Sequence, residues 1–244
     1  MTGPVLVVSA TQGEVAPLEA ALADVAPLTP REATRPATWW DRRQGRWGGL
    51  QVVLVTTGVG KANAAAATAL AIDRVAPRCV LLLGIGGAYP GSGLGIGEVA
   101  LAASETQVDS GVGHGPSWEG LDAVGFPLLA TDPPSYNRLW FDQRFVSRVA
   151  RELGVRAVPF GTSEALTADV GRAEWLARRH GVAVESMEGG AVAQVALGFG
   201  VPLVQLRGVA NAVGVRDKAH WNMKAAVANS CEVAKRALTL LEVA

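Results

Sequence analysis

Cysteine and histidine are both scarce in this chain. Its 244 residues include two cysteines, Cys79 and Cys231, and three histidines. The cysteines form no CxxC pair, and no group of Cys, His, Asp and Glu residues has the spacing of metal ligands. We therefore expect both cysteines to be small buried hydrophobic residues, and we predict neither a disulfide nor a metal or other cofactor.

An excess of charge of either sign is also missing. The chain has 22 Lys and Arg residues against 22 Asp and Glu residues, and its formal net charge is +0. No block of basic residues stands out. Because nucleic acids are bound largely through their phosphates, this composition argues against a nucleic-acid partner and favours a small-molecule ligand.

Long apolar runs are absent near the N-terminus. The run over residues 4–10 is too short for a signal sequence or a membrane span, and no basic region precedes it. This predicts a cytoplasmic protein that does not contact a membrane. The length suits one large α/β domain over residues 1–244.

The glycine patterns of nucleotide-binding loops are absent as well. Gly58, Gly60 and Lys61 follow an apolar run and open an alanine-rich helix, so backbone amides and a lysine could hold a phosphate there. The Walker glycine before Gly60 and the Ser or Thr after Lys61 are missing, and the chain has no GxGxxG with a later strand-end acid. We interpret this segment as a tight turn that packs a helix on a sheet. A dinucleotide-dependent oxidoreductase is correspondingly disfavoured.

What the chain does contain is a strand that ends at acids and glycines. Residues 182–186 form an apolar run that stops at Glu185 and Glu188, and a helical pattern begins near Ala191. Residues 203–209 form the next apolar run, so the unit predicts two parallel strands joined by a helix. Glu188 then lies where open α/β sheets bind ligands. The alternative is that Glu188 only caps the helix and compensates its dipole.

Two other predicted strands end in a similar way. Residues 4–9 lead to a second acid, Glu14, and residues 79–83 lead into a glycine turn at residues 84–87. The glycine turn has too little side chain to fill its own space. Three strand ends, two acids and a glycine turn together predict a pocket.

The remaining patterns predict the elements around this pocket. We expect a helix over residues 14–24 with Val25 in its buried stripe, an antiparallel hairpin of residues 38–44 and 50–56 shielded by Trp39, Trp40 and Trp47, a helix capped by Ser135, a strand over residues 157–162 and a last helix from Met223. The irregular segment 107–134 is long for a connection inside one domain. We expect it to cover the pocket and to contact the variable part of a substrate.

The histidines carry no pattern that supports catalysis. His180 ends a charged helix and is expected to be solvated, while His114 lies in the long irregular segment and His220 precedes the last helix. Glu164 and Asp169 are interpreted as a loop acid and a helix cap.

Together these pieces resemble the purine nucleoside phosphorylase and nucleoside hydrolase superfamily, and within it the futalosine hydrolases. The resemblance rests on the strand and acid at Glu14, the 84–87 turn, the run 186–190 and the strand end 207–211 with the segment that follows it. It implies an α/β fold, a single domain with a central twisted mixed β-sheet flanked by helices, and a homo-oligomer.

The resemblance also implies an activity, which is hydrolysis of the N-glycosidic bond of a 6-oxopurine nucleoside. The substrate expected is futalosine, cleaved to hypoxanthine and dehypoxanthine futalosine in menaquinone biosynthesis. Glu14 would hold and deprotonate the attacking water, and Glu188 would bind the ribose hydroxyls and stabilise the ribosyl cation. The implied substrate contacts besides Glu188 are Gly86, Gly87, Leu166, Thr167 and Met187.

Other activities stay open beside this one. Phosphorylases of the superfamily bind phosphate through an arginine and a serine at the places where this chain has Leu82 and Ile85, neither of which binds an anion. This favours water over phosphate, although Arg207 or Arg216 could substitute. A methylthioadenosine/S-adenosylhomocysteine nucleosidase and a non-catalytic nucleoside sensor are further alternatives.

Asn211 is where the chain departs from the adenine-releasing hydrolases, which have a serine and an aspartic acid at the places of Ala210 and Asn211. An asparagine amide can donate to N7 and O6 of a 6-oxopurine and so stabilise the charge on departing hypoxanthine. Asp217 would orient the Asn211 amide or supply a proton. The alternative is that Asn211 merely ends a strand.

Overall fold

The computed structural model describes residues 3–28 and 41–242, in which ten strands form one mixed sheet. These strands are β1 (Val5–Ser9), β2 (Ala23–Pro27), β3 (Asp41–Trp47), β4 (Leu50–Thr56), β5 (Cys79–Ala88), β6 (Val99–Gln107), β9 (Arg138–Trp140), β10 (Arg156–Thr162), β11 (Val184–Ser186) and β12 (Leu203–Ala212). A separate two-stranded sheet consists of β7 (Gly111–Val112) and β8 (Glu119–Gly120).

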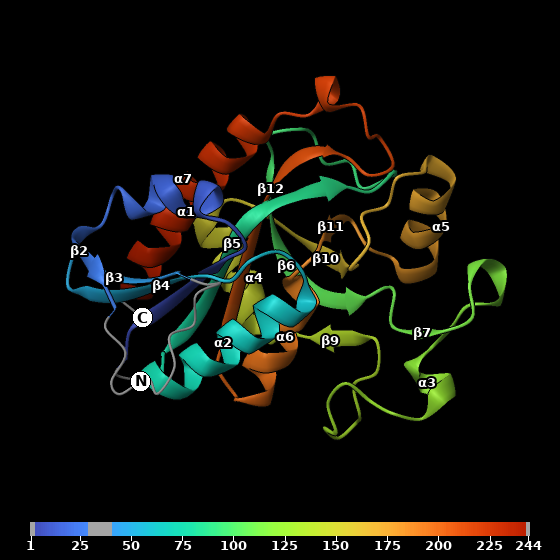
Figure 1. Cartoon of the computed structure of the whole chain (residues 1–244), viewed down its shortest axis with the longest axis horizontal. Helices are drawn as coiled ribbons and strands as arrows, with labels where there is room; N and C mark the ends of the chain where they lie inside the picture. Colours follow the sequence, from blue (N-terminus) through green and yellow to red (C-terminus); the bar gives the residue numbers. More distant parts are fainter. Residues whose placement is uncertain (1–2, 29–40, 243–244) are drawn as a thin grey trace.

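Helices lie on both sides of the large sheet. They are α1 (Gln12–Glu19), α2 (Lys61–Val75), α3 (Leu121–Val124), α4 (Gln143–Leu153), α5 (Val170–His180), α6 (Gly189–Gly198) and α7 (Met223–Glu242), with short 3-10 turns η1 (Gly115–Ser117) and η2 (Lys218–His220). Helices α1 and α7 pack together on one side, and α2 and α6 pack together on the other (Figure 1). The predicted α/β fold with a twisted mixed sheet flanked by helices is confirmed.

The order of the strands decides where a site can form. It runs β11-β10-β6-β12-β5-β1-β4-β3-β2, and β9 pairs with β6. Strand β11 also pairs with β5, so the five strands β11, β10, β6, β12 and β5 close into a ring. The parallel strands β1, β4, β5 and β12 all reach their carboxyl ends at the same edge of the sheet.

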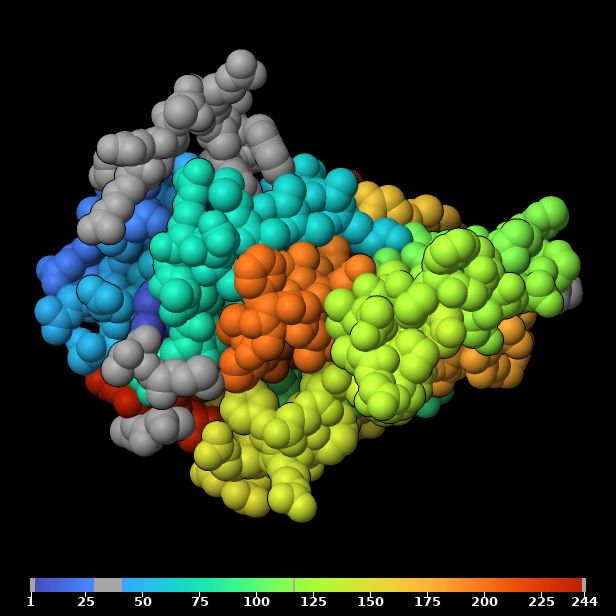
Figure 2. Space-filling model, turned by 90° about the horizontal axis from the view of Figure 1, so that it is seen from below, coloured from blue at the N-terminus to red at the C-terminus, as the bar shows by residue number. Residues whose placement is uncertain are grey.

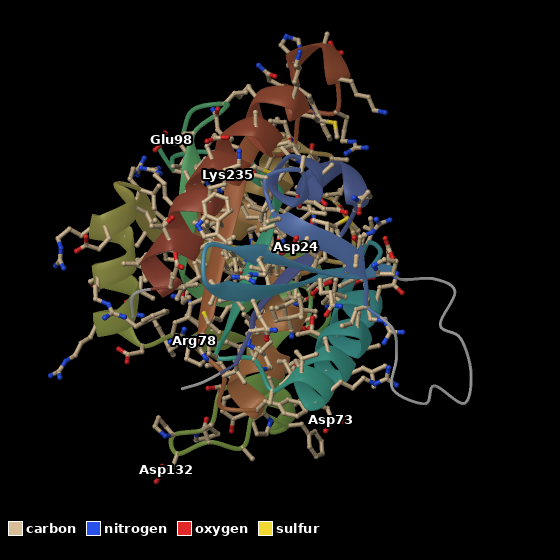
Figure 3. All side chains as sticks on the ribbon, turned by 90° about the vertical axis from the view of Figure 1, so that its left-hand side faces the viewer. Asp24, Asp73, Arg78, Glu98, Asp132 and Lys235 are labelled. Carbon is tan, nitrogen blue, oxygen red and sulfur yellow. The ribbon has the colours of Figure 1, made fainter. Side chains whose placement is uncertain are left out.

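The core follows from the apolar runs. Every residue of β1 is buried, and so are all residues of β5 except Ile85. Continuous apolar strands of this kind are expected where a parallel sheet is covered on both faces. In contrast, the charged side chains labelled in Figure 3 are not in the core: Asp24 and Asp73 are exposed, and Arg78 and Lys235 are half-buried.

Strand β11 does not run as the sequence predicted. It was expected to lie parallel to β12. In the structure β11, β10 and β6 are parallel to one another, and β12 is antiparallel to β6. The two strands therefore run in opposite directions. The local strand-helix-strand pattern could not predict the direction of β11, because that direction is determined by the pairing of β11 with β5, which closes the ring.

The glycines at residues 84–87 belong to a strand, so the expected turn is wrong. They continue β5, and β11 crosses it there, with Val184 opposite Ala88 and Glu185 opposite Gly87. A Cβ on Gly86 would lie 2.8 Å from the carbonyl oxygen of Glu185. Glycine is thus needed because two backbones approach closely, which leaves this part of the sheet open toward a ligand.

Two other boundaries also differ from the predictions. Helix α1 ends at Glu19 rather than at residue 24, because residues 23–27 pair with β3 as the edge strand β2. Val25 is accordingly 37% exposed and not part of a buried stripe. The helix predicted after Ser135 begins only at Gln143, and its cap is Asp142, which accepts from the amides of Arg144 and Phe145.

The predicted hairpin is present, but its first strand continues to Trp47 instead of ending at residue 44, and the segment 107–134 that was expected to be irregular contains β7, η1, β8 and α3. Strands β3 and β4 pair antiparallel across Gly48 and Gly49, and the indole of Trp47 donates to Thr239 Oγ1 at 3.0 Å. Trp39 and Trp40 lie outside the described residues. The segment between β6 and β9, coloured light green, projects from one end of the molecule (Figure 2).

Candidate active site

A cavity of about 300 Å³ lies at the carboxyl ends of β1, β5, β11 and β12. Its size is at the lower end of the range typical of small-molecule sites. The lining residues are Ala10, Thr11, Glu14, Val59, Ile85, Gly86, Gly87, Leu166, Thr167, Glu185, Ser186, Met187, Glu188, Asn211, Val215, Arg216, Trp221 and Met223. Eight of the nine residues predicted for the site are among them, and Asp217 is the exception.

Glu14 is held at the start of α1 by three donors. The amide and the hydroxyl of Thr11 each donate to Glu14 Oε2 at 3.0 Å, and the amide of Ile85 donates to Oε1 at 2.9 Å. The bond from the Thr11 amide belongs to a capping box, in which a helix N-terminus and a glutamate three residues on satisfy each other. The carboxylate is 8% exposed and lines the cavity in a fixed orientation.

Glu188 is the residue at which α6 begins, yet its side chain does not cap the helix. The amide of Gly60 donates to Oε1 at 3.2 Å, and the guanidinium of Arg207 donates to Oε2 at 3.2 Å. The interpretation of Glu188 as a helix cap is therefore wrong for its side chain. Glu188 is 5% exposed, so it is a buried residue that lines the cavity.

Arg207 lies near both carboxylates and forms an ion pair with one of them, Glu188. It is 1% exposed, pairs with Glu188, and donates from Nη1 to the carbonyl oxygen of Ile85 at 3.2 Å. Its Nη1 and Glu14 Oε1 both adjoin the place where Gly84 would carry a Cβ. Two acids around one arginine leave a net negative charge when both are ionised, and this charge favours a cation bound in the cavity.

A third buried acid, Glu185, supports the wall formed by Leu166 and Thr167. Glu185 accepts from the amide of Thr167 and from the hydroxyl of Tyr89, each at 3.1 Å. Burial and the neighbouring carboxylate raise the pKa of Tyr89, so its hydroxyl stays a donor. Glu185 thereby fixes the backbone at Thr167, one of the residues that the family resemblance implies as a substrate contact.

Asn211 lies near the end of β12 and lines the cavity. Its Nδ2 donates to the carbonyl oxygen of Ala212 at 2.8 Å, which uses one of the two amide protons. The side chain also lies against Gly87, whose Cβ would be 3.4 Å from Nδ2. One N–H and the amide oxygen are left for a ligand.

The segment after β12 folds over the cavity. Val215, Arg216, Trp221 and Met223 line it, and the indole of Trp221 donates to the carbonyl oxygen of Val215 at 2.9 Å. The guanidinium of Arg216 lies over the Trp221 ring, 5.3 Å from its centroid. This wall therefore offers an aromatic face and a positive charge.

Asp217 is not brought to Asn211. Its carboxylate caps η2 by accepting from the amide of Ala219 at 3.0 Å, and it lies 3.3 Å from Nδ1 of His220. The side chain is exposed and does not line the cavity.

The segment around Lys61 supports the site without binding an anion itself. The ammonium group pairs with Asp109 at 2.8 Å, and the amide of Lys61 donates to Glu164 Oε2 at 2.9 Å. The charge of Lys61 is thus already neutralised, and the amide of Gly60 already donates to Glu188. This agrees with the interpretation as a turn that packs a helix on the sheet.

The long segment expected to cover the pocket lies elsewhere. Within residues 107–134, no residue that the structure describes lines the cavity. Trp118 instead packs edge-on against Trp175 and His180 of α5, with ring centroids 6.3 and 5.0 Å away.

His180 is partly buried in this cluster, so the expectation that it is solvated is wrong. Burial and the neighbouring arginines, Arg179 and Arg138, lower the pKa of His180 to about 4. The ring is therefore neutral near pH 7.

Asp169 caps α5 by accepting from the amide of Arg172 at 2.7 Å, as predicted. Among the described residues, no three His, Cys, Asp or Glu side chains are grouped as metal ligands.

Sequence reasoning assigned no site role to Glu185 or Trp221 and considered Arg207 only as a possible phosphate ligand. A signal for Arg207 was present, since one arginine within the apolar run 203–209 must find a buried partner. Glu185 could also have been noticed as an acid at an inward position of a strand. The partners of both depend on strand order, which the local sequence does not contain.

Fold and cavity together define an α/β protein with a small-molecule-sized, partly apolar cavity lined by the carboxylates of Glu14 and Glu188. The Phosphorylase superfamily model matches residues 4–239, so the chain belongs to that superfamily.

Relatives of known name narrow the class within the superfamily. A futalosine hydrolase of Thermus thermophilus is 39% identical over 196 residues, which cover 79% of this chain and 84% of that protein. A futalosine hydrolase of Streptomyces coelicolor is 31% identical and covers 91% of both chains. These similarities show a nucleosidase-type hydrolase.

A solved structure has the same fold. The 5′-methylthioadenosine/S-adenosylhomocysteine nucleosidase of Neisseria meningitidis, in complex with methylthio-immucillin-A, has a TM-score of 0.79 at 22% identity. The match covers 97% of this chain and 99% of that one.

Proposed function

We propose that this protein hydrolyses the N-glycosidic bond of a 6-oxopurine nucleoside and that its substrate is futalosine, which it cleaves to hypoxanthine and dehypoxanthine futalosine. The observation that carries the proposal is the pair of buried carboxylates, Glu14 and Glu188, in one cavity that Asn211 also lines. The names of the two relatives support futalosine as the substrate.

Glu14 activates the attacking water in this proposal. Water attacks C1′ of the ribose and the C1′–N9 bond breaks, with its electron pair leaving on the purine. A general base must accept the water proton, and a carboxylate held by three donors is oriented for that task. Such a base contributes roughly 10²–10⁴-fold to a rate.

Glu188 stabilises the sugar as positive charge develops on it. Each carboxylate oxygen accepts one hydrogen bond from the protein and retains a lone pair for a ribose hydroxyl. Its negative charge lies in a buried, weakly screened place, where it stabilises an oxocarbenium-like transition state more than the neutral substrate. Met187 adjoins it and packs against the sugar.

Water is favoured over phosphate because anion donors are scarce in the described cavity wall. Leu82 and Ile85 take the places of the phosphate-binding residues, and Arg207 is neutralised by Glu188. Arg207 does not line the cavity, and Arg216 is the one arginine among the described lining residues, on the segment after β12. Self-association into a homo-oligomer stays a prediction from the family resemblance, and a cytoplasmic location stays a prediction from the short apolar run near the N-terminus. None of the described helices is long and apolar enough to span a membrane.

The assay that tests this function compares three nucleosides. Futalosine, inosine and methylthioadenosine are each incubated with the protein, with and without phosphate, and the free base and sugar product are measured. We expect hypoxanthine from futalosine at a rate that phosphate does not change. A sugar 1-phosphate would show a phosphorylase, and preferred release of adenine from methylthioadenosine would overturn the substrate assignment.

Asn211→Asp should change the selection of the base. An ionised carboxylate would face O6 of hypoxanthine with like charge and no donor, whereas it can accept from a 6-amino group. We expect the ratio of kcat/KM on futalosine to that on an adenine nucleoside to fall at least about 10-fold.

Asn222→Asp is the matched control for this variant. Asn222 lies outside the cavity and accepts from the amide of Ala225 at 3.0 Å, a capping role that aspartate performs equally well. The control should keep the wild-type ratio. If Asn211→Asp keeps it too, Asn211 does not select the base.

A further inference from the structure

A buried carboxyl group without a role in the proposed reaction lies beneath the first turn of α6. Glu105, on β6, is 0% exposed. Its Oε1 accepts from the hydroxyl of Thr162 at 2.5 Å, and its Oε2 makes no hydrogen bond. A buried acid of this kind needs a physical reason.

The hydrogen bonds of Thr162 connect Glu105 to α6. The amide of Gly190 donates to Thr162 Oγ1 at 2.7 Å, and the threonine hydroxyl then donates to Glu105. Amides in the first turn of a helix have no partner within the helix. Gly190 is such a residue, so the chain from Gly190 through Thr162 to Glu105 anchors the start of α6 on β10 and β6.

The anchored turn is the one that carries Glu188. Its backbone oxygen accepts from the amides of Ala191 and Val192 at 3.0 and 3.1 Å, so the residue is fixed to this turn. Its side chain must reach Gly60 and Arg207 while facing the cavity. A shift of the helix start would therefore move the carboxylate within the site.

The space under this turn is closely filled. A Cβ on Gly189 would lie 2.7 Å from Glu105 Oε2 and would also meet the side-chain amide of Gln205, a residue of β12. A Cβ on Gly190 would lie 3.2 Å from that of Thr162. The turn rests directly on these side chains, with no room for it to slide.

We propose that Glu105 is a positioning residue for Glu188. Glu105 acts as a neutral carboxylic acid and anchors the first turn of α6 through Thr162. The proposal rests on the proposed function, in which Glu188 contacts the substrate.

The charges around Glu105 explain why its protonation state matters. Burial, and to a smaller extent the negative charge of Glu188, raise the pKa of Glu105 to about 7, against the opposing effects of Thr162, Arg207 and Gln205. Thr162 comes from β10, Gln205 and Arg207 come from β12, Glu188 stands at the start of α6, and Leu139 of β9 faces Glu105 without a charge. An ionised Glu105 would compete with Glu188 for Arg207.

Glu105→Gln tests the proposal through pH profiles of kcat. Glutamine keeps an acceptor for Thr162 and cannot ionise, so the variant should retain activity within about 3-fold at pH 6. The wild-type kcat should fall above about pH 7, and this fall should be absent from the variant. A variant with the wild-type pH profile, or with a loss above 10-fold at pH 6, would overturn the proposal.

Thermal unfolding without substrate separates this proposal from the proposed function. A carboxyl group with a pKa raised on folding contributes stability below its unfolded pKa, near 4.3, and loses it as pH rises toward 7. The Tm of the wild type relative to Glu105→Gln should thus fall by at least about 5 °C between pH 4.5 and pH 7.5. A constant difference in Tm would contradict the neutral acid even if no nucleoside is hydrolysed.

Thr162 and Ser104 provide the companion variants. Thr162→Val removes the connecting hydroxyl and should lower kcat about 10-fold, as expected for a lost buried hydrogen bond, while Thr162→Ser should restore it. Ser104 lies on the same strand as Glu105, and its buried hydroxyl has no hydrogen-bond partner. Ser104→Ala should therefore leave the pH dependence of kcat and of Tm unchanged. Equal effects of the valine and serine variants would exclude the connection.

Discussion

Glu14→Gln should lower kcat at least about 10²-fold while leaving the protein folded. The amide cannot accept a proton from water, so the general base is lost. Glutamine nevertheless retains one oxygen for the donors that hold Glu14, and it occurs at this position of capping boxes. We expect a loss of stability near about 1 kcal/mol, from one hydrogen bond that the amide cannot accept.

Glu19→Gln is the matched control, because it changes the same group on the same helix. Glu19 contacts Gln12 and lies 3.5 Å from Arg43, outside the cavity. The rates of both variants are measured as base released from the nucleoside that the wild type cleaves, and folding is followed by circular dichroism. Near-normal turnover in Glu14→Gln would remove this residue from the mechanism.

The two acids could be predicted from sequence because of how parallel strands are built. A strand covered on both faces is a continuous apolar run, so residues 4–9 and 182–186 identify their own ends. Glu14 and Glu188 follow those ends within a few residues, and the carboxyl ends of parallel strands are where ligands bind. Only the strand boundaries were needed to find them, and the family resemblance supplied the roles.

The direction of β11 and the partner of Arg207 could not be predicted in the same way. Both depend on which strands become neighbours, and β5 pairs with β1, β12 and β11, which are far apart in the chain. The local pattern around Glu188 also suggested a helix cap, whereas the structure shows an ion pair with Arg207. Long-range pairing outweighed local preference at both places.

Arg207→Met should cost about 3–5 kcal/mol in the free energy of unfolding, the range for breaking a buried ion pair. Methionine fills much of the volume of the arginine side chain but leaves Glu188 as a buried charge with only the Gly60 amide as partner. Unfolding in urea measures the loss. Arg43→Met is the control, since Arg43 pairs with Asp41 and Glu19 on the surface, and it should stay close to the wild type.

The double variant Arg207→Met/Glu188→Gln separates the two roles of the ion pair. Without the charge on residue 188 there is no uncompensated buried ion, so the double variant should be more stable than Arg207→Met by at least about 1 kcal/mol. It should still hydrolyse no nucleoside at a measurable rate, because the negative charge that stabilises the ribosyl cation is gone. Stability would then return without activity. If the double variant is as unstable as Arg207→Met, the cost comes from the packing of the arginine rather than from the charge that it leaves behind.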